Sequence, residues 1–320
     1  MCGRYVMAKA IGDLVAEAEA EADANLELRQ SWNVAPTSDV PVVLERLIDG
    51  TAGTGTPQTV GTGTDREGEA SARQPRAVRQ VHVARWGLVP GWAKDISVGV
   101  RAFNARSETL LEKPTFRDAV LSRRCAVPME GYYEWKTGPG NSKQPYFVHR
   151  PDGKLSWFAG LYEWWADPAV PAGDPGRWLL STTIITLAAP DPEDPHPVLA
   201  GLGTLHNRLP LPLASAALAA WTAPGTLSNT GALDLLGQVL DQAYPTASNL
   251  QIRAADPAVG SVRNDGPWLL EPPELDTAPG LDTVPGLDTA PRLDTPPGQD
   301  TAAGSAPGGV REPATENVLF

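Results

Sequence analysis

The sequence predicts a mixed fold of α-helices and β-strands, and two kinds of pattern support this. Short runs rich in Val, Ile, Thr and aromatic residues favour strands, while other stretches rich in Ala, Leu and Glu favour helices. With 320 residues, of which 42% are hydrophobic, the chain is long enough to bury a full core. The length allows one large domain or two small ones.

Helices are expected in four places. Residues 11–30 are rich in Ala, Leu and Glu, which predicts an early helix with an acidic outer face. A second helix should start at Asn104 or Ser107, because either side chain can cap it. The remaining two are expected at 211–221 and 232–240.

Strands are expected along much of the remaining chain. Residues 81–90 alternate between apolar and polar side chains before a turn with Pro and Gly. Residues 181–186 contain only Ser, Thr and Ile, which favour a strand strongly. The full set of expected strands is 39–47, 81–90, 124–128, 131–136, 145–148, 157–162 and 178–187.

Two stretches are not expected to contribute to the core. Residues 50–78 are rich in Gly, Thr and Ser without an apolar period, which is typical of a flexible surface insertion. From about residue 275 the sequence repeats every six residues with Pro in most units, so 273–320 should form a disordered, partly polyproline-like tail. The folded domain is therefore expected to cover 1–272.

The formal net charge of −12 argues at first sight against a nucleic-acid partner, because phosphate binding usually leaves a basic signature. The charge is unevenly distributed, however. From Glu271 onward nine acidic residues stand against two arginines, so this end carries −7 of the −12. The rest of the chain is only mildly acidic and leaves room for a local basic groove.

Cysteine and histidine usage excludes several kinds of site. Cys2 and Cys125 are too few for a disulfide framework or a cysteine zinc site, and the four histidines lack metal-ligand spacing, so we expect no metal and no cofactor. Cys125 has apolar neighbours and should be a buried core thiol. Neither a long apolar run nor a signal-peptide pattern is present, which predicts a cytoplasmic protein without a membrane partner.

The most reactive feature is the start of the chain, Met1-Cys2-Gly3-Arg4. If Met1 is removed, Cys2 carries a thiol and a free α-amine two carbons apart. This pair can trap an aldehyde as a five-membered thiazolidine, or the thiol can attack an amide carbonyl with the amine as its general base. A third interpretation is that position 2 simply holds a small residue.

Further stretches combine reactive side chains with Arg or Trp. Taken with the start of the chain, they are Cys2-Gly3-Arg4, Trp32-Asn33-Val34-Ala35-Pro36, Arg85-Trp86-Gly87-Leu88-Val89-Pro90-Gly91-Trp92, Asn104-Ala105-Arg106-Ser107-Glu108-Thr109, Arg124-Cys125, Gly131-Tyr132-Tyr133-Glu134-Trp135-Lys136, Gln144-Pro145-Tyr146-Phe147, His206-Asn207-Arg208-Leu209-Pro210 and Val262-Arg263-Asn264-Asp265-Gly266-Pro267. In this order the motifs resemble those of the SRAP (SOS response associated peptidase) family of abasic-site processing proteins. The resemblance spans residues 2 to about 272, and the number and order of the motifs make accidental agreement improbable.

The resemblance implies a single α+β domain, in which a curved, barrel-like antiparallel sheet with flanking helices borders one open groove. It also implies a role in DNA damage and the SOS response, in which the protein binds single-stranded DNA containing abasic sites at the nucleoid. Cys2 would capture the ring-opened sugar aldehyde as a covalent thiazolidine crosslink. The resemblance further implies an AP lyase activity. The peptidase activity in the family name would remove Met1 in cis or act on a peptide, and removal of Met1 by an aminopeptidase is equally consistent with the sequence.

The catalytic residues implied by the resemblance are Cys2, Asn104, Glu134 and His206. Cys2 is the nucleophile, and Glu134 would take the proton of its ammonium group. His206 would act on the sugar hydroxyl or ring oxygen, and Asn104 would hold the terminus in place.

The implied DNA contacts are mainly arginines. Arg106 and Arg208 would grip backbone phosphates, since a guanidinium suits bidentate phosphate contact. We expect a monomer with no metal. The further DNA-binding candidates are Arg4 and Arg85, as weaker phosphate contacts, and Trp86 and Trp92, which could stack on a base.

Two other function classes stay open at this point. An N-terminal nucleophile amidohydrolase, such as a glutaminase domain, also begins Met-Cys-Gly and would use the Cys2 thiol against an amide carbonyl. A non-covalent single-strand binder would tolerate Cys2→Ala, whereas the crosslinking protein would not.

Overall fold

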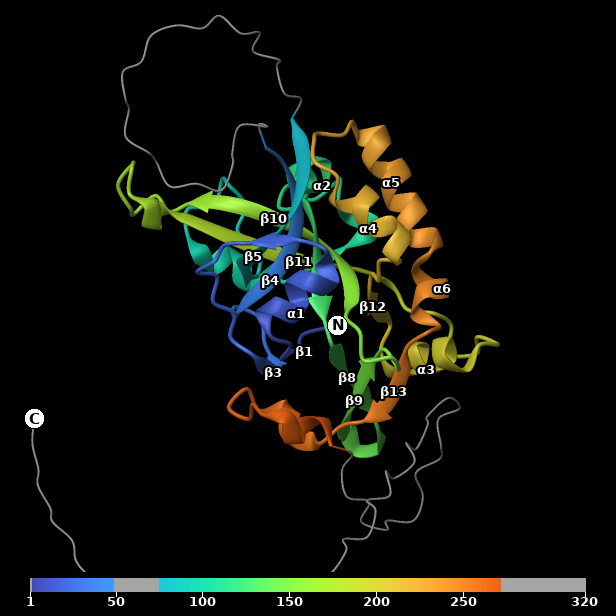
Figure 1. The fold of residues 1–320 in the computed structure, drawn as a ribbon. Helices are drawn as coiled ribbons and strands as arrows, with labels where there is room; N and C mark the ends of the chain where they lie inside the picture. Colours follow the sequence, from blue (N-terminus) through green and yellow to red (C-terminus); the bar gives the residue numbers. More distant parts are fainter. Residues whose placement is uncertain (1, 49–74, 272–320) are drawn as a thin grey trace, which may run out of the picture. The chain divides into compact units, whose positions relative to one another are not determined.

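The structure is a computed structural model that describes residues 2–48 and 75–271. The expected insertion between 50 and 74 and the expected tail at 273–320 lie outside the described residues. Within them, a closed barrel, a second sheet and a set of short helices are arranged as in Figure 1.

Five of the described strands close into a barrel, which confirms the barrel-like sheet that the resemblance implies. β11 is buried on both faces over eight consecutive residues, and other strands pair with both of its edges. Neighbouring strands pair antiparallel, and a parallel pairing of Ser181 with Arg85 closes the barrel between β11 and β5. In order around the barrel, the strands are β11 (Trp178–Ala188), β10 (Ser156–Ala166), β7 (Arg124–Met129), β4 (Asp39–Ile48) and β5 (Arg76–Trp86).

Short strands extend the barrel at two places. β2 (Glu21–Ala22) pairs with β5. β6 (Asn104–Arg106) and β12 (Arg208–Pro210) both pair with the second half of β11, β6 in parallel and β12 antiparallel. Since both pair at Thr186, they lie on opposite edges of β11, and this brings two distant motifs together.

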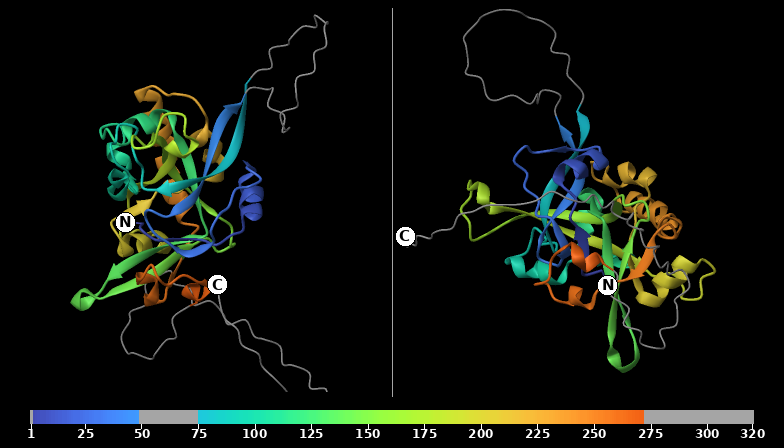
Figure 2. Two further views of the ribbon diagram at one scale, coloured as in Figure 1. Left: turned by 90° about the vertical axis from the view of Figure 1, so that its left-hand side faces the viewer. Right: turned by 60° about the horizontal axis from the view of Figure 1, so that its bottom comes forward.

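A second sheet holds the start of the chain. Its strand pairs are antiparallel, and the β8–β9 hairpin projects from it in Figure 2. β1 lies between β8 and β3, so the residues just before β1 are carried onto the edge of β8. In order, the strands are β13 (Gln251–Ala254), β9 (Lys143–His149), β8 (Gly131–Thr137), β1 (Tyr5–Met7) and β3 (Ser31–Val34).

The helices flank the sheets. α4, α5 and α6 lie along one side of the barrel (Figure 1), where α4 packs against β7 and β10. α3 packs against β8 and β13 of the second sheet. The α-helices are α1 (Ile11–Ala18), α2 (Arg117–Ser122), α3 (Pro197–Leu205), α4 (Ser215–Thr222), α5 (Asn229–Asp241) and α6 (Ala243–Ala247), and the 3-10 helices are η1 (Ile96–Arg101), η2 (Ser107–Thr109), η3 (Pro139–Asn141), η4 (Pro175–Arg177), η5 (Pro257–Gly260) and η6 (Pro267–Leu270).

The sequence-based prediction of elements is largely confirmed, with three corrections. Each expected strand has a counterpart, and Cys125 is a buried core thiol as expected. The early helix expected over 11–30 ends at Ala18, because Glu19 adopts a left-handed conformation. The helix expected at Asn104 is wrong: this segment is strand β6 followed by a single 3-10 turn, since pairing with β11 holds it extended. Finally, β5 begins at Arg76, inside the expected insertion.

Candidate active site around Cys2

Strand pairing brings the start of the chain to β8. β1 pairs antiparallel with β8, and Tyr5 lies opposite Tyr132. The same register, continued toward the N-terminus, sets Gly3 opposite Glu134. Cys2 therefore lies beside Glu134, although the two are far apart in the sequence.

Asn104 holds the backbone of Cys2 from the other sheet. Its side-chain Nδ2 donates a hydrogen bond of 2.7 Å to the carbonyl oxygen of Cys2. Asn104 is itself fixed because it opens β6, where it lies opposite Ile184 of β11. Its Oδ1 is buried and accepts no hydrogen bond from the described residues. An acceptor therefore stands beside the Cys2 backbone.

The thiol of Cys2 is fully buried. Burial raises the pKa of the Cys2 thiol well above its ordinary value, and the negative charge of Glu134 raises it further. Tyr5 and Tyr132 belong to the same cluster, since burial and then the charge of Cys2 raise the pKa of both. In the chain that still carries Met1, the thiol is thus protonated at neutral pH.

Glu134 places a carboxylate in the middle of this cluster. Its side chain is 5% exposed, and Oε1 accepts the N–H of Trp135 at 3.3 Å. Its charge raises the pKa of Cys2, Tyr132 and His206, so the carboxylate lies within electrostatic reach of all three. A carboxylate in this position can accept a proton and return it.

His206 reaches the cluster from the end of α3. Its Nδ1 accepts the backbone N–H of Arg208 at 2.9 Å, so the neutral ring carries its proton on Nε2. Burial lowers the pKa of His206, while the charge of Glu134 opposes this shift. At neutral pH the ring is uncharged and acts as a hydrogen-bond donor through Nε2.

β6 and β12 place two arginines on opposite edges of β11. Arg106 lies opposite Thr186 and is exposed, and its side chain forms no hydrogen bond or ion pair with the described residues. Arg208 is largely buried, donates to the Thr186 carbonyl at 2.6 Å, and forms a bidentate pair with Glu108 at 2.6 and 2.9 Å. Arg106 is therefore free to bind an anion, whereas Arg208 already holds one.

Two residues considered for DNA contact belong to the framework instead. Arg4 donates to the side chain of Asn33 at 3.0 Å and to the carbonyl of Val259 at 2.9 Å, which anchors the segment that follows β13. Trp86 is fully buried, and its indole N–H donates to the carbonyl of Phe103 at 2.9 Å. As folded, Trp86 offers no face on which a base could stack.

The other two candidates lie nearer the surface. Arg85 is partly buried and donates to the carbonyl of Thr37 at 3.0 Å. Trp92 is 59% exposed, which leaves its indole available for stacking. These two residues suit contact with a ligand better than Arg4 and Trp86 do.

A groove of about 720 Å³ opens next to Asn104 and contains basic residues that the sequence analysis did not single out. Arg101 and Lys113 line it together with the ring of Phe116. Both cations are exposed. The sequence does contain a signal for a basic surface here, because Arg101, Arg106 and Lys113 lie within one short stretch of the chain. The groove gives the Cys2 site a locally basic border on an acidic protein.

The described residues show no metal centre and no membrane span. Among them, no group of three or more His, Cys, Asp and Glu side chains is arranged to hold a metal ion. None of the helices in 2–48 and 75–271 is long and apolar enough to cross a membrane.

Several curated proteins are similar to this chain over most of its length. The abasic site processing protein YoqW of Bacillus subtilis is 30% identical over 272 residues, which covers 85% of this chain and 99% of YoqW. The abasic site processing protein HMCES of Rattus norvegicus is 28% identical over 275 residues, which covers 77% of this chain and 65% of HMCES. A crystal structure of a protein from Bacteroides thetaiotaomicron shares the fold, with a TM-score of 0.58, 20% identity, and coverage of 85% and 99%.

The family comparison covers the whole site described above. The model of the SOS response associated peptidase (SRAP) family matches residues 1–262, a range that includes Cys2, Asn104, Glu134 and His206. This match and the similarity to YoqW agree with the barrel and with the motifs found in the sequence. The chain therefore belongs to the SOS response associated peptidase (SRAP) family.

Proposed function

We propose that this protein processes abasic sites in DNA by forming a covalent thiazolidine crosslink through Cys2. The names of the curated relatives, which are abasic site processing proteins, support the substrate. The observation that carries the chemistry is the position of Cys2, whose carbonyl is held by Asn104 at 2.7 Å beside the buried carboxylate of Glu134.

The reaction requires the free α-amine of Cys2 and therefore the loss of Met1. The amine adds to the ring-opened sugar aldehyde, and the resulting carbinolamine loses one water to give an imine. The thiol then adds to the imine carbon, its proton passes to the nitrogen, and the five-membered ring closes. Glu134 would carry the protons of both steps, because a buried carboxylate beside the terminus can take the ammonium proton and return it.

His206 would act on the sugar. An abasic sugar exists mostly as a closed ring, so the aldehyde must be released first. The Nε2–H of the neutral His206 ring can donate to the ring oxygen or hydroxyl while Nδ1 stays on the Arg208 N–H. The same residue would assist the AP lyase reaction, a β-elimination in which the α carbon next to the captured aldehyde loses a proton and the 3′-phosphate leaves the β carbon.

The DNA strand would lie across the basic border of the site. Arg106 is exposed and without a partner among the described residues, which suits contact with a phosphate. Arg101 and Lys113 would continue this contact along the groove beside Asn104, and Trp92 would stack on a base. Arg208 would release the carboxylate of Glu108 and bind a phosphate in its place.

The test is a crosslinking assay with single-stranded DNA that bears one abasic site. Wild-type protein should give a species that resists denaturation, and DNA without the lesion should not. Cys2→Ala should abolish this species and Cys125→Ala should leave it, since both thiols are buried but only Cys2 lies beside Glu134. The reverse pattern would exclude the proposal. Intact mass of the purified chain should show the loss of Met1.

A peptidase acting through Cys2 is the second candidate, because the matched family is named for this activity. It would need the thiolate as the nucleophile, and burial and Glu134 both keep the Cys2 thiol protonated. The aldehyde trap is therefore favoured. The peptidase would be supported if the purified chain, refolded without any aminopeptidase, releases Met1 while the Cys2→Ala variant keeps it.

A further inference from the structure

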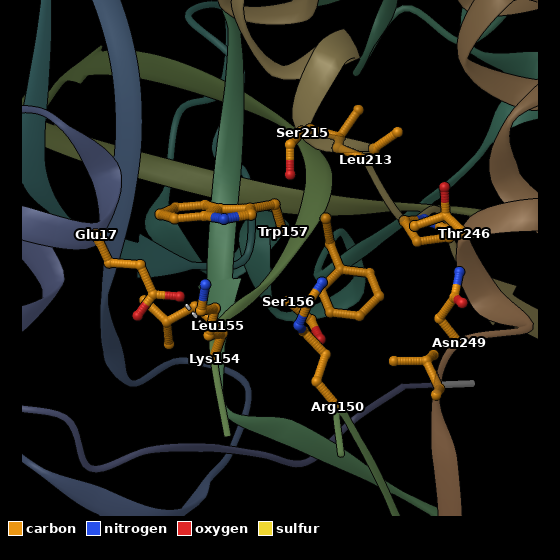
Figure 3. Close-up of a pocket in the computed structure, with 14 residues that line it drawn as sticks. Glu17, Arg150, Lys154, Leu155, Ser156, Trp157, Leu213, Ser215, Thr246 and Asn249 are labelled. Atoms are coloured by element: carbon orange, nitrogen blue, oxygen red, sulfur yellow. Dashed lines mark hydrogen bonds between the residues drawn. The ribbon is translucent and has the colours of Figure 1, made fainter. Parts of the chain in front are cut away.

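A second pocket is lined by residues that belong to none of the motifs of the Cys2 site. It is formed by the turn between β9 and β10, the start of α4 and the end of α6, and it encloses about 260 Å³ (Figure 3). An adjoining groove of about 530 Å³ shares Arg150, Ser215, Thr246 and Asn249 with it. None of Cys2, Asn104, Glu134 and His206 lines either space. The pocket is therefore separate from the proposed active site.

The positive end of α4 borders this pocket. α4 is an eight-residue helix, and its N-cap position is Ala214, which offers no side-chain acceptor. The backbone N–H groups of Ser215 and Ala216 in the first turn have no acceptor within the helix. Ser215 lines the pocket, and its hydroxyl is exposed. This end of the helix presents several donors and a partial positive charge.

A buried hydroxyl on the opposite side lacks a partner. Ser156 is 7% exposed, lines the same pocket, and its Oγ forms no hydrogen bond with the described residues. In Figure 3 Ser156 lies next to Arg150, while Ser215 faces them across the pocket. A buried hydroxyl normally finds a partner. A ligand in the pocket would supply the acceptor that the chain does not.

The charges around the pocket leave it positive. Glu17 is the acidic lining residue, and both of its oxygens are engaged: Oε1 accepts the N–H of Leu155 and Oε2 pairs with Lys9, each at 2.6 Å. Arg150 is paired with Asp152. Lys154 lines the pocket, is exposed, and forms no ion pair with the described residues. Its charge, added to the helix terminus, favours an anion.

We propose that this pocket binds the phosphate group of a phosphomonoester. Donors approach from the helix terminus, from Ser156 on the opposite side, and from Lys154. A phosphate, with three terminal oxygens, uses such an arrangement fully. The group could be carried by a free nucleotide or by the end of a DNA strand, and both present the same chemistry. The site stands whether or not Cys2 forms a crosslink.

The experiment is calorimetric titration of the full chain at constant ionic strength. Inorganic phosphate and thymidine 5′-monophosphate should bind with a Kd of about 1 mM or tighter, and thymidine should not bind. Ser215→Asp should weaken binding at least about tenfold, because its carboxylate would sit at the helix terminus in place of the phosphate. Ser156→Ala and Lys154→Ala should each weaken it about threefold to fivefold.

Lys143→Ala is the matched control, because Lys143 is an exposed lysine at the other end of β9. It should bind phosphate like the wild type, and circular dichroism should show that all variants fold. An oligonucleotide with a 5′-phosphate that binds tighter than its 5′-hydroxyl counterpart identifies a DNA end as the source, and equal binding identifies a free phosphorylated molecule. Absence of phosphate binding up to about 10 mM, or phosphate binding that Ser215→Asp leaves unchanged, overturns the proposal.

Discussion

The guanidinium of Arg208 and the carboxylate of Glu108 form a bidentate pair, with hydrogen bonds of 2.6 and 2.9 Å. The hydrogen bonds from Arg208 lower the pKa of Glu108, so the pair is charged at neutral pH. Arg208 also donates to the carbonyl of Thr186, which keeps its side chain in place if Glu108 leaves. Glu108 thus holds the guanidinium to which the proposed function assigns a DNA phosphate.

Removing this internal competitor should strengthen DNA binding. We expect Glu108→Gln to tighten the binding of single-stranded DNA about threefold to tenfold, because a neutral amide releases the guanidinium for a phosphate. Fluorescence anisotropy at several salt concentrations measures this, and the slope against salt should become steeper. Glu112→Gln, which removes an exposed carboxylate nearby, is the control and should have a smaller effect. Equal or weaker binding by Glu108→Gln would show that Glu108 supports the DNA contact.

The reactivity of Cys2 should depend on Glu134. Burial and the charge of Glu134 raise the pKa of the Cys2 thiol, so in the chain that carries Met1 alkylation should be slow at neutral pH and accelerate only in alkali. Glu134→Gln removes the charge and should shift the rate profile to lower pH. The assay is iodoacetamide labelling of Cys2, followed by mass spectrometry, in a Cys125→Ala background. An unshifted profile would place Glu134 too far from the thiol to act on it.

Alkali should also weaken the fold through its buried thiols. Burial raises the pKa of Cys125 to about 12, from an unfolded value of 9.0. Above pH 9.0 the unfolded chain releases the thiol proton that the folded chain keeps. The contribution of the neutral Cys125 thiol to the free energy of unfolding is therefore complete below pH 9.0 and is lost as the pH rises toward 12. Urea unfolding between pH 8 and 11 should show a falling midpoint, and Cys125→Ala should fall less steeply. If the urea midpoints of the wild type and Cys125→Ala fall in parallel with pH, the alkaline loss of stability does not come from Cys125.

Much of the site could be predicted from the sequence, because the reactive residues lie in short motifs. The structure brings Cys2, Asn104, Glu134 and His206 together, and their catalytic roles stay a prediction. The pairing of β1 with β8 and of β6 with β11 does this, and neither pairing is visible in the local pattern. This is also why Asn104 was expected in a helix: its capping preference is local, whereas its strand pairing depends on residues eighty positions away.

The functional meaning of the arginines and tryptophans could not be predicted in the same way. Trp86 and Trp92 stand in one motif, yet Trp86 is fully buried and Trp92 is 59% exposed. Likewise, Arg208 pairs with Glu108 while Arg106 is free of described partners. Such differences depend on which long-range neighbour covers each side chain, and a motif does not contain that information.

Acid should weaken crosslinking through His206. Burial lowers the pKa of His206, and its unfolded value is 6.5. The folded ring therefore stays neutral down to below pH 6.5, and protonating it breaks the Nδ1 contact with the Arg208 N–H. The contribution of His206 to the rate of crosslink formation should be constant above pH 6.5 and should fall only below it. His206→Gln should slow the reaction tenfold or more, by about 1.4 kcal/mol or more in the barrier, and should remove this acid dependence. If His206→Gln is slow but its rate keeps the same dependence on acid pH, that dependence comes from another group.

Asn33 should be needed for stability and not for chemistry. Its side-chain Nδ2 donates to the carbonyls of Val259, Ser261 and Asn264, and its Oδ1 accepts from Arg4. Asn33 is 5% exposed, so Asn33→Ala leaves several of these groups buried without partners. We expect a loss of about 2 to 4 kcal/mol in the free energy of unfolding, measured in urea. Asn25→Ala, in an exposed loop, is the matched control and should change it by about 0.5 kcal/mol or less. Since the Asn33 side chain bonds Arg4 and the segment after β13, and none of its hydrogen bonds goes to a proposed catalytic residue, the variant should crosslink at the wild-type rate at low temperature, where it is folded. A small stability loss with a large rate loss would instead make the Asn33–Arg4 contact part of the catalytic machinery.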